Sequence, residues 1–207
     1  MNINLIFPNQ LFEKSTILEN SYTTFLIEEY LFFNQYKFHK QKILFHRDSM
    51  INYYSFLKNK GKNVKYINSF DNESDVRVFL KNTNVKEINI YNPVDNWLEK
   101  RIISSCLKEK IKINIHENPL FLTKKSELIP FFSPTKKKLF QTSFYKNQRI
   151  KFSVLLDNQN KPEGGKWTYD DLNRKKYPKN KQTPSIDYSF LKSKSHNDSL
   201  KYVSKYF

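Results

Sequence analysis

Five short apolar runs, separated by longer segments of helical periodicity, constrain the fold of this 207-residue chain more than any other feature of its sequence. Strands that alternate with helices in this way form a mostly parallel sheet, joined by right-handed crossovers. The predicted strands are residues 3–7, 24–28, 64–67, 87–91 and 111–115. We therefore predict a Rossmann-like α/β fold, a mostly parallel five-stranded sheet with helices on both faces.

Three helical segments fall between these strands. The clearest begins near His39 and ends at Gly61, because glycine is the usual residue at a left-handed helix end. Its apolar stripe, which should face the sheet, is Ile43, Met50, Tyr54 and Leu57. A weaker helix is predicted over residues 74–81, with Asp71 or Ser74 as its N-cap, and a third over residues 94–108.

The rhythm changes after residue 116. Prolines interrupt residues 130–134, and a basic helix is predicted over residues 136–152, followed by a polar, lysine-rich segment typical of a linker. The sequence thus predicts an α/β domain over residues 1–156 and a basic linker over residues 157–207, with a short helix at residues 199–207.

Positive charge is concentrated in the last third of the chain. The formal net charge is +16, and residues 136–207 hold 17 Lys and Arg against 6 Asp and Glu. The chain has no alanine and abundant Lys, Asn and Ile, so an AT-rich coding sequence would explain its total positive charge. Such a coding bias would not explain why the positive charge is concentrated in one part of the chain. Segregated charge favours a polyanionic partner, with nucleic acid ahead of an anionic membrane.

The linker cations that we expect to contact DNA phosphates are Arg174, Lys175, Lys176, Lys179 and Lys181. A merely solvated linker is the alternative interpretation.

Several kinds of site are excluded or disfavoured. Cys106 is the only cysteine, so this chain builds neither a disulfide nor a cysteine-ligated cluster. No apolar run approaches the roughly 18 residues of a membrane span, and the N-terminus lacks the pattern of a signal peptide, so we expect a cytoplasmic protein without membrane contact. No Walker loop follows the first strand, and the histidines lack zinc-site spacing. We predict no catalytic residue and no metal ligand within these residues.

Polar residues follow the first two predicted strands. Asn9 and Gln10 come after the first strand, Glu28 and Glu29 after the second, and parallel sheets bind ligands at this edge. Such groups suit the polar edge of a heteroaromatic ring or a ribityl chain. Ordinary loop polar groups would give the same pattern.

Two of the three glycines stand together, in Gly164-Gly165-Lys166-Trp167. A chain so poor in glycine places one where the backbone needs a positive φ or a close approach. The pair therefore indicates a specific local structure at residues 164–174.

Three stretches together resemble one family. These are residues 5–11, residues 39–43 with Met50, and the Gly-Gly-Lys-Trp stretch with Asp170, Asn173 and Arg174. They are similar to the photolyase-related group of the cryptochrome/photolyase superfamily, the bacterial 6-4 photolyases that carry an iron–sulfur cluster. The resemblance runs through nearly the whole chain.

The resemblance implies an N-terminal antenna domain, a basic linker that starts near the glycine pair, and a C-terminal helical domain that holds FAD and the 4Fe-4S cluster. We expect that last domain to be absent from these 207 residues. The implied function is light-dependent DNA repair of the 6-4 photoproduct class, when the chain is joined to an FAD-binding domain. The implied partner is DNA, and we expect a monomer. A stand-alone basic α/β module that binds nucleic acid or a nucleotide-like ligand without catalysis is the alternative.

The resemblance also implies a ribityllumazine- or flavin-type antenna chromophore at the strand ends. The matching residues are Asn9, Gln10, Glu28, Phe32, Gln35, Lys42 and His46.

Overall fold

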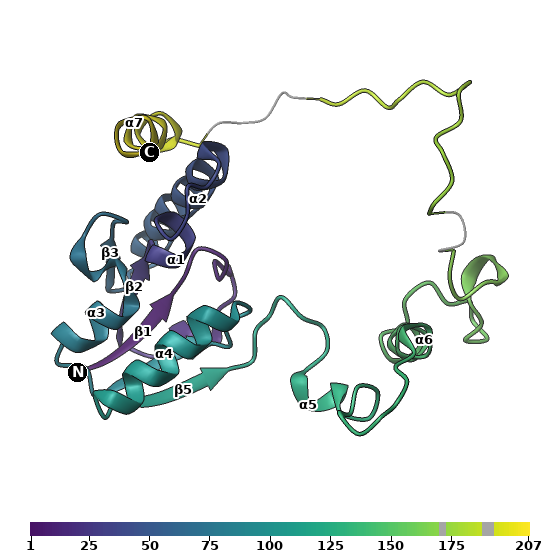
Figure 1. The fold of residues 1–207 in the computed structure, drawn as a ribbon, viewed down its shortest axis with the longest axis horizontal. Coiled ribbons are helices and arrows are strands. Elements are labelled where there is room, and N and C mark those ends of the chain that lie inside the picture. The colour runs from purple at the N-terminus through teal and green to yellow at the C-terminus, as the bar shows by residue number, and fades with distance from the viewer. Residues whose placement is uncertain (170–172, 188–192) are drawn as a thin grey trace. The chain divides into compact units, whose positions relative to one another are not determined.

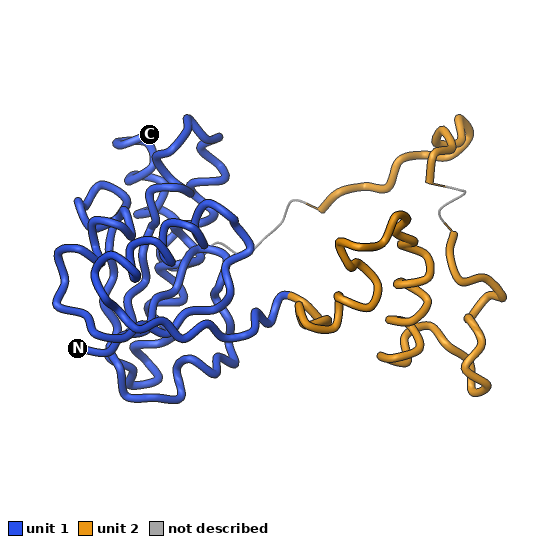
Figure 2. Tube along the Cα trace, turned by 60° about the horizontal axis from the view of Figure 1, so that its bottom comes forward, with its two compact units in different colours: residues 1–120, 190–207 blue, residues 121–189 orange. Residues whose placement is uncertain are grey.

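The structure, a computed structural model, describes residues 1–169, 173–187 and 193–207 (Figure 1). The chain forms two compact units, and we describe each by itself. The first consists of residues 1–120 and 190–207, and the second of residues 121–189 (Figure 2).

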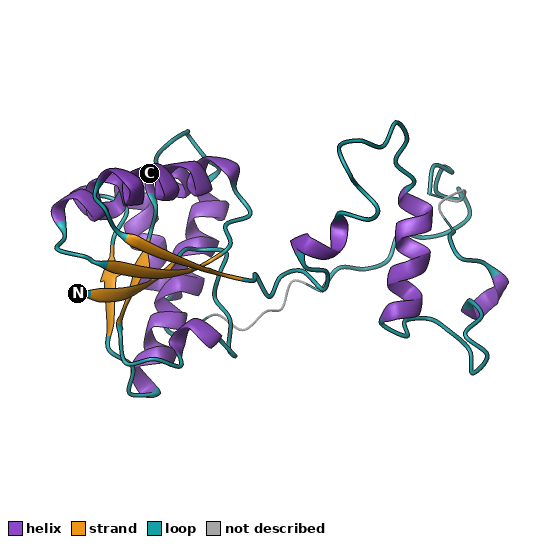
Figure 3. Ribbon diagram, turned by 90° about the horizontal axis from the view of Figure 1, so that it is seen from below, coloured by secondary structure: helices purple, strands orange, loops and turns teal. Residues whose placement is uncertain are grey.

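A five-stranded parallel sheet is the centre of the first unit (Figure 3). The strand order is β3-β2-β1-β4-β5, which confirms the predicted Rossmann-like α/β fold. The strands are β1 (Asn2–Ile6), β2 (Thr23–Ile27), β3 (Val64–Ile67), β4 (Glu87–Tyr91) and β5 (Lys112–His116). Each lies within one residue of its predicted position.

Helices cover both faces of this sheet, so its central strands are buried on both sides. On one face, α3 (Val76–Asn82) and α4 (Asn96–Lys108) pack on Ile3, Leu5 and Ile88. On the other, α2 (Lys40–Asn59) packs on Ile6 and Leu26.

Short helical turns complete the connections between these elements. They are α1 (Tyr30–Phe33) and the 3-10 turns η1 (Thr16–Leu18) and η2 (Asn72–Ser74). The N-cap of α3 is Asp75, which accepts from the Arg77 amide, rather than either predicted residue. Asp71 instead precedes η2.

The last helix, α7 (His196–Tyr206), packs on α2 and belongs to the first unit. Its buried Val203 joins the apolar cluster of Met50 and Leu57, and Asp48 of α2 accepts hydrogen bonds from Ser193 and Ser195. The short helix predicted at residues 199–207 thus begins three residues earlier and packs on the α/β unit, whereas its polar surroundings had favoured a linker. The first unit is therefore built from both ends of the chain, and its N-terminal segment ends at Leu120.

The second unit has short helices and few buried side chains. Its elements are α5 (Lys125–Leu128), α6 (Gln141–Lys151) and the 3-10 turn η3 (Glu163–Gly165). Arg149 of α6 is its best-buried residue, and its guanidinium donates to the carbonyls of Val154, Leu155, Lys166 and Trp167. One arginine thus connects α6 to two separate stretches of loop.

The glycine pair adopts the predicted backbone. Gly164 and Gly165 have φ of 71° and 75°, values that L side chains rarely adopt. A Cβ on Gly164 would also clash with the Tyr169 hydroxyl, which donates to the Gly164 carbonyl at 3.0 Å. The close approach at this motif is therefore between two parts of the same loop. Asp170, the next residue of the motif, lies outside the described residues.

Candidate ligand site at the carboxyl edge of the sheet

The carboxyl ends of β1 and β2 bring the predicted polar residues to one edge of the sheet. Asn9 and Gln10 lie in the turn after β1, and Glu28 and Glu29 follow β2. Because β1 and β2 are adjacent and parallel, these two pairs are neighbours in the fold.

Glu28 is fully buried and committed to an internal network. Its carboxylate accepts from Arg47 Nη1 at 2.6 Å, from the Tyr66 hydroxyl at 2.5 Å and from the Ser69 amide at 2.8 Å. Burial, and then the Glu28 charge, raise the pKa of Tyr66, which keeps its hydroxyl a donor. Glu28 thus holds β2, β3 and α2 together.

The Tyr202 ring of α7 covers Arg47 from outside, with the guanidinium carbon 3.4 Å from the ring centroid. The Tyr202 hydroxyl lies 3.1 Å from the Ser69 hydroxyl, so the C-terminal helix closes over the same network. An arginine that is bonded on one side and stacked on the other is fixed in position.

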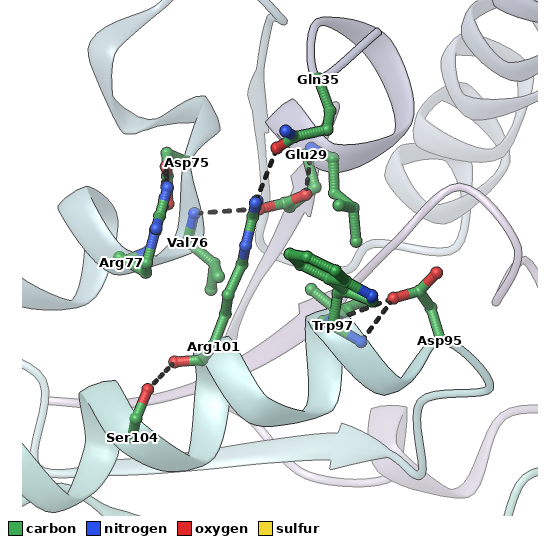
Figure 4. Close-up of polar contacts among 11 residues, drawn as sticks. Glu29, Gln35, Asp75, Val76, Arg77, Asp95, Trp97, Arg101 and Ser104 are labelled. Carbon is green, nitrogen blue, oxygen red and sulfur yellow. Dashed lines mark hydrogen bonds and ion pairs between the residues drawn. The ribbon is translucent and has the colours of Figure 1, made fainter.

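Glu29, the next residue, faces a different set of partners (Figure 4). Its buried carboxylate caps α1 through the Leu31 amide at 2.5 Å and lies 3.6 Å from Arg101 Nη1. Burial raises the pKa of Glu29 to about 7, although the Leu31 amide and the Arg101 charge oppose the shift. Gln35 accepts from Arg101 Nη2 at 2.7 Å, so α1 and α4 are joined here.

Two of the predicted chromophore residues hold buried polar atoms without a partner. Neither Asn9 Oδ1 nor His46 Nδ1 has a hydrogen bond within the described residues. Burial and the nearby Lys42 charge lower the pKa of His46, so its ring is neutral at neutral pH. The ring lies near three aromatic side chains, with centroids 6.3 Å from Phe32, 6.1 Å from Phe33 and 6.3 Å from Phe45.

The remaining predicted residues have separate surroundings. The buried Gln10 donates to the Tyr91 carbonyl at 3.2 Å and thereby ties the turn after β1 to the end of β4. Lys42 is exposed, and its amine lies 3.5 Å from the Phe38 ring centroid. The structure therefore brings Phe32 and His46 together, but it places Glu28 and Gln35 in two different networks. Arg47 and Arg101, which organise these networks, were not predicted.

The predicted DNA-contacting residues lie in the second unit. Arg174, Lys175, Lys176, Lys179 and Lys181 are all exposed. Their role is not tested by the structure.

Other chemistry at the described residues is limited. They contain no group of three or more His, Cys, Asp or Glu side chains that could hold a metal ion. Cys106 is buried, and burial raises the pKa of its thiol to about 11. Within the same residues, no helix has both the length and the apolar character needed to cross a membrane.

Comparison with known proteins identifies the family. The family model described as deoxyribodipyrimidine photo-lyase-related protein matches residues 4–207. An uncharacterized protein, R852, of Acanthamoeba polyphaga mimivirus is 35% identical over 188 residues, which cover 86% of this chain and 95% of that protein. Because the family match takes in both units and the returning helix α7, the chain belongs to the deoxyribodipyrimidine photo-lyase-related proteins.

Proposed function

We propose that this chain is the antenna-type α/β module of a photolyase-related protein and binds a ribityllumazine- or flavin-like chromophore at the carboxyl edge of its sheet. Joined to an FAD-binding domain, it would serve light-dependent repair of DNA, of the 6-4 photoproduct class. The observation that carries the proposal is the pair of unpartnered buried atoms, Asn9 Oδ1 and His46 Nδ1.

These atoms fit such a ligand chemically. A buried polar group without a hydrogen bond costs on the order of 1–3 kcal/mol, so a bound molecule that supplied the partner would be stabilised by a similar amount. Lumazine and flavin rings carry both N–H and C=O groups along one edge. The rings of Phe32 and Phe33 beside His46 offer the apolar contact that a flat heteroaromatic molecule needs.

In this proposal Glu28 acts on the site through α2. It fixes Arg47, which lies next to His46 in the sequence, and does not itself face the chromophore. The iron–sulfur cluster of the resembling photolyases has no place in these residues, because Cys106 is the only cysteine and a cluster needs several.

Optical titration tests the chromophore site. We expect the purified chain either to absorb light between roughly 350 and 450 nm or to bind added ribityllumazine or riboflavin saturably. His46→Leu should weaken this binding about tenfold, since it removes the ring nitrogen and keeps an apolar side chain of similar size. Asn59→Leu, at an exposed position at the end of the same helix, is the matched control and should bind normally.

A colourless protein that takes up neither compound would contradict the proposal. Equal affinity of the His46→Leu and Asn59→Leu variants would contradict this placement of the site.

DNA contact is assigned to the second unit. The exposed cations between Arg174 and Lys181 flank Tyr177, and lysines in such loops contact phosphates without reading the base sequence.

A further inference from the structure

A groove between α3 and α4 is lined by residues outside the proposed chromophore site. Its volume is about 600 Å³, within the range of small-molecule sites. Arg77 comes from α3, and the other lining residues lie on α4 between Asn96 and Leu107. The groove lies on the face of the sheet opposite α2, and therefore opposite His46.

The groove presents an aromatic ring and positive charge side by side. Trp97 is 62% exposed, and the cations Arg77, Lys100 and Arg101 share the lining with it, without any carboxylate among the lining residues. Figure 4 shows Arg101 extending from α4 between Arg77 and the Trp97 ring. An exposed indole offers a stacking surface to any base or similar ring.

The three cations differ in how far they are already neutralised. Asp75 accepts from Arg77 Nε and Nη2, and Arg101 contacts Gln35 and Glu29. Arg101 Nη1 still has no hydrogen bond within the described residues. Lys100 is exposed and forms no ion pair with the part of the chain that the structure describes. The groove therefore keeps a net positive charge next to an aromatic surface.

We propose that this groove binds a mononucleotide, with the base stacked on Trp97 and the phosphate bound by Lys100 together with Arg77. A nucleotide combines a flat ring and an anion at the separation that one turn of α4 provides, since Trp97 and Lys100 are three residues apart on the same helix. Arginine and lysine are the usual phosphate-binding side chains. This site is distinct from the chromophore site and does not depend on it.

Fluorescence of Trp97 tests the site directly. The chain has two tryptophans, so a Trp167→Phe parent leaves Trp97 as the only indole. We expect AMP to quench its emission saturably and adenosine to bind about tenfold more weakly, because adenosine lacks the phosphate. Inorganic phosphate alone should not quench.

Two lysine variants of the Trp167→Phe parent distinguish binding at a specific nucleotide site from non-specific electrostatic attraction. Lys100→Ala should weaken AMP binding about tenfold at low salt, whereas Lys108→Ala, on the same helix but outside the groove, should not change it. Both lysines are exposed, so neither variant should impair folding. His46→Leu should also leave AMP binding unchanged.

Absence of saturable quenching by AMP would overturn the proposal. So would equal affinities for AMP and adenosine, or equal effects of the Lys100 and Lys108 variants. None of these outcomes depends on whether a chromophore binds at His46.

Discussion

Arginine is used sparingly in this chain, and its positions are informative. There are 5 arginines among the 36 basic residues, and three of them have side chains that are almost buried. Arg47 bonds Glu28, Arg101 bonds Gln35 beside Glu29, and Arg149 bonds four carbonyls in the second unit. Each position uses the rigid fork of donors that lysine lacks. Three of the five arginines therefore organise buried polar networks, whereas Arg77 and Arg174 are more exposed.

Glu29 makes the stability of the first unit depend on pH. Its pKa rises from an ordinary 4.5 to about 7 on folding, so folding favours the protonated form. This protonation stabilises the folded state fully below about pH 4.5. The stabilisation is lost as the pH rises through 7, and the total loss is on the order of 3 kcal/mol. We expect Glu29→Gln to flatten the pH dependence of the free energy of unfolding between pH 5 and about 7.5, measured with urea.

Glu19→Gln, at an exposed position of the same unit, is the control and should keep the parent's slope. Burial lowers the pKa of His46, which acts in the opposite direction, so the comparison of parent and variant isolates Glu29. A Glu29→Gln protein with the parent's full slope would show that this carboxyl titrates normally.

Among the elements, the strands and the helices that cover them were the most predictable, and the docking of α7 was the least, although its helix was predicted. β1, β2 and β4 are short runs rich in apolar residues, and α2 carries apolar residues at helical spacing, so local pattern was sufficient. The docking of α7 depends on contacts across more than 130 residues, such as Ser69 with Tyr202. Periodicity cannot show such contacts, and the few apolar residues of α7 resembled a solvated linker.

Tyr202, beside Val203, is one of the residues that hold α7 on the first unit. Tyr202→Ala removes the ring that covers Arg47 and leaves that cation without its outer contact, so we expect the first unit to lose about 2 kcal/mol of stability. Hydrogen exchange should show amides of α7 opening faster, while those of β1 and β4 stay protected. Lys201→Ala, one residue earlier and exposed, should change neither quantity. Unchanged exchange in α7 after Tyr202→Ala would mean that other contacts hold the helix.

At the scale of the whole molecule, the two units divide the charge unequally. Residues 121–189 carry 15 Lys and Arg against 6 Asp and Glu, whereas the first unit carries 21 against 14 over twice the length. The sequence predicted a basic C-terminal third, and the structure assigns most of that charge to a unit with little core. The candidate site was less predictable, because His46 and Phe32 meet only through the packing of α1 and α2. The sequence also does not show that both edge carboxylates, Glu28 and Glu29, are paired with internal arginines.

This division of charge predicts where DNA would bind. Each lysine that contacts a phosphate releases a counterion and adds about 0.9 to the slope of log affinity against log salt. We expect neutralisation of Lys175, Lys176, Lys179 and Lys181 to glutamine to reduce that slope by about 3 to 4 on duplex DNA, measured by anisotropy between roughly 50 and 200 mM salt. The matched control neutralises four exposed lysines of the first unit, Lys14, Lys40, Lys81 and Lys108. Equal losses in the two variants would indicate binding through net charge alone, whereas a loss confined to the first variant locates the phosphate contacts on the second unit, where the exposed cations surround Tyr177.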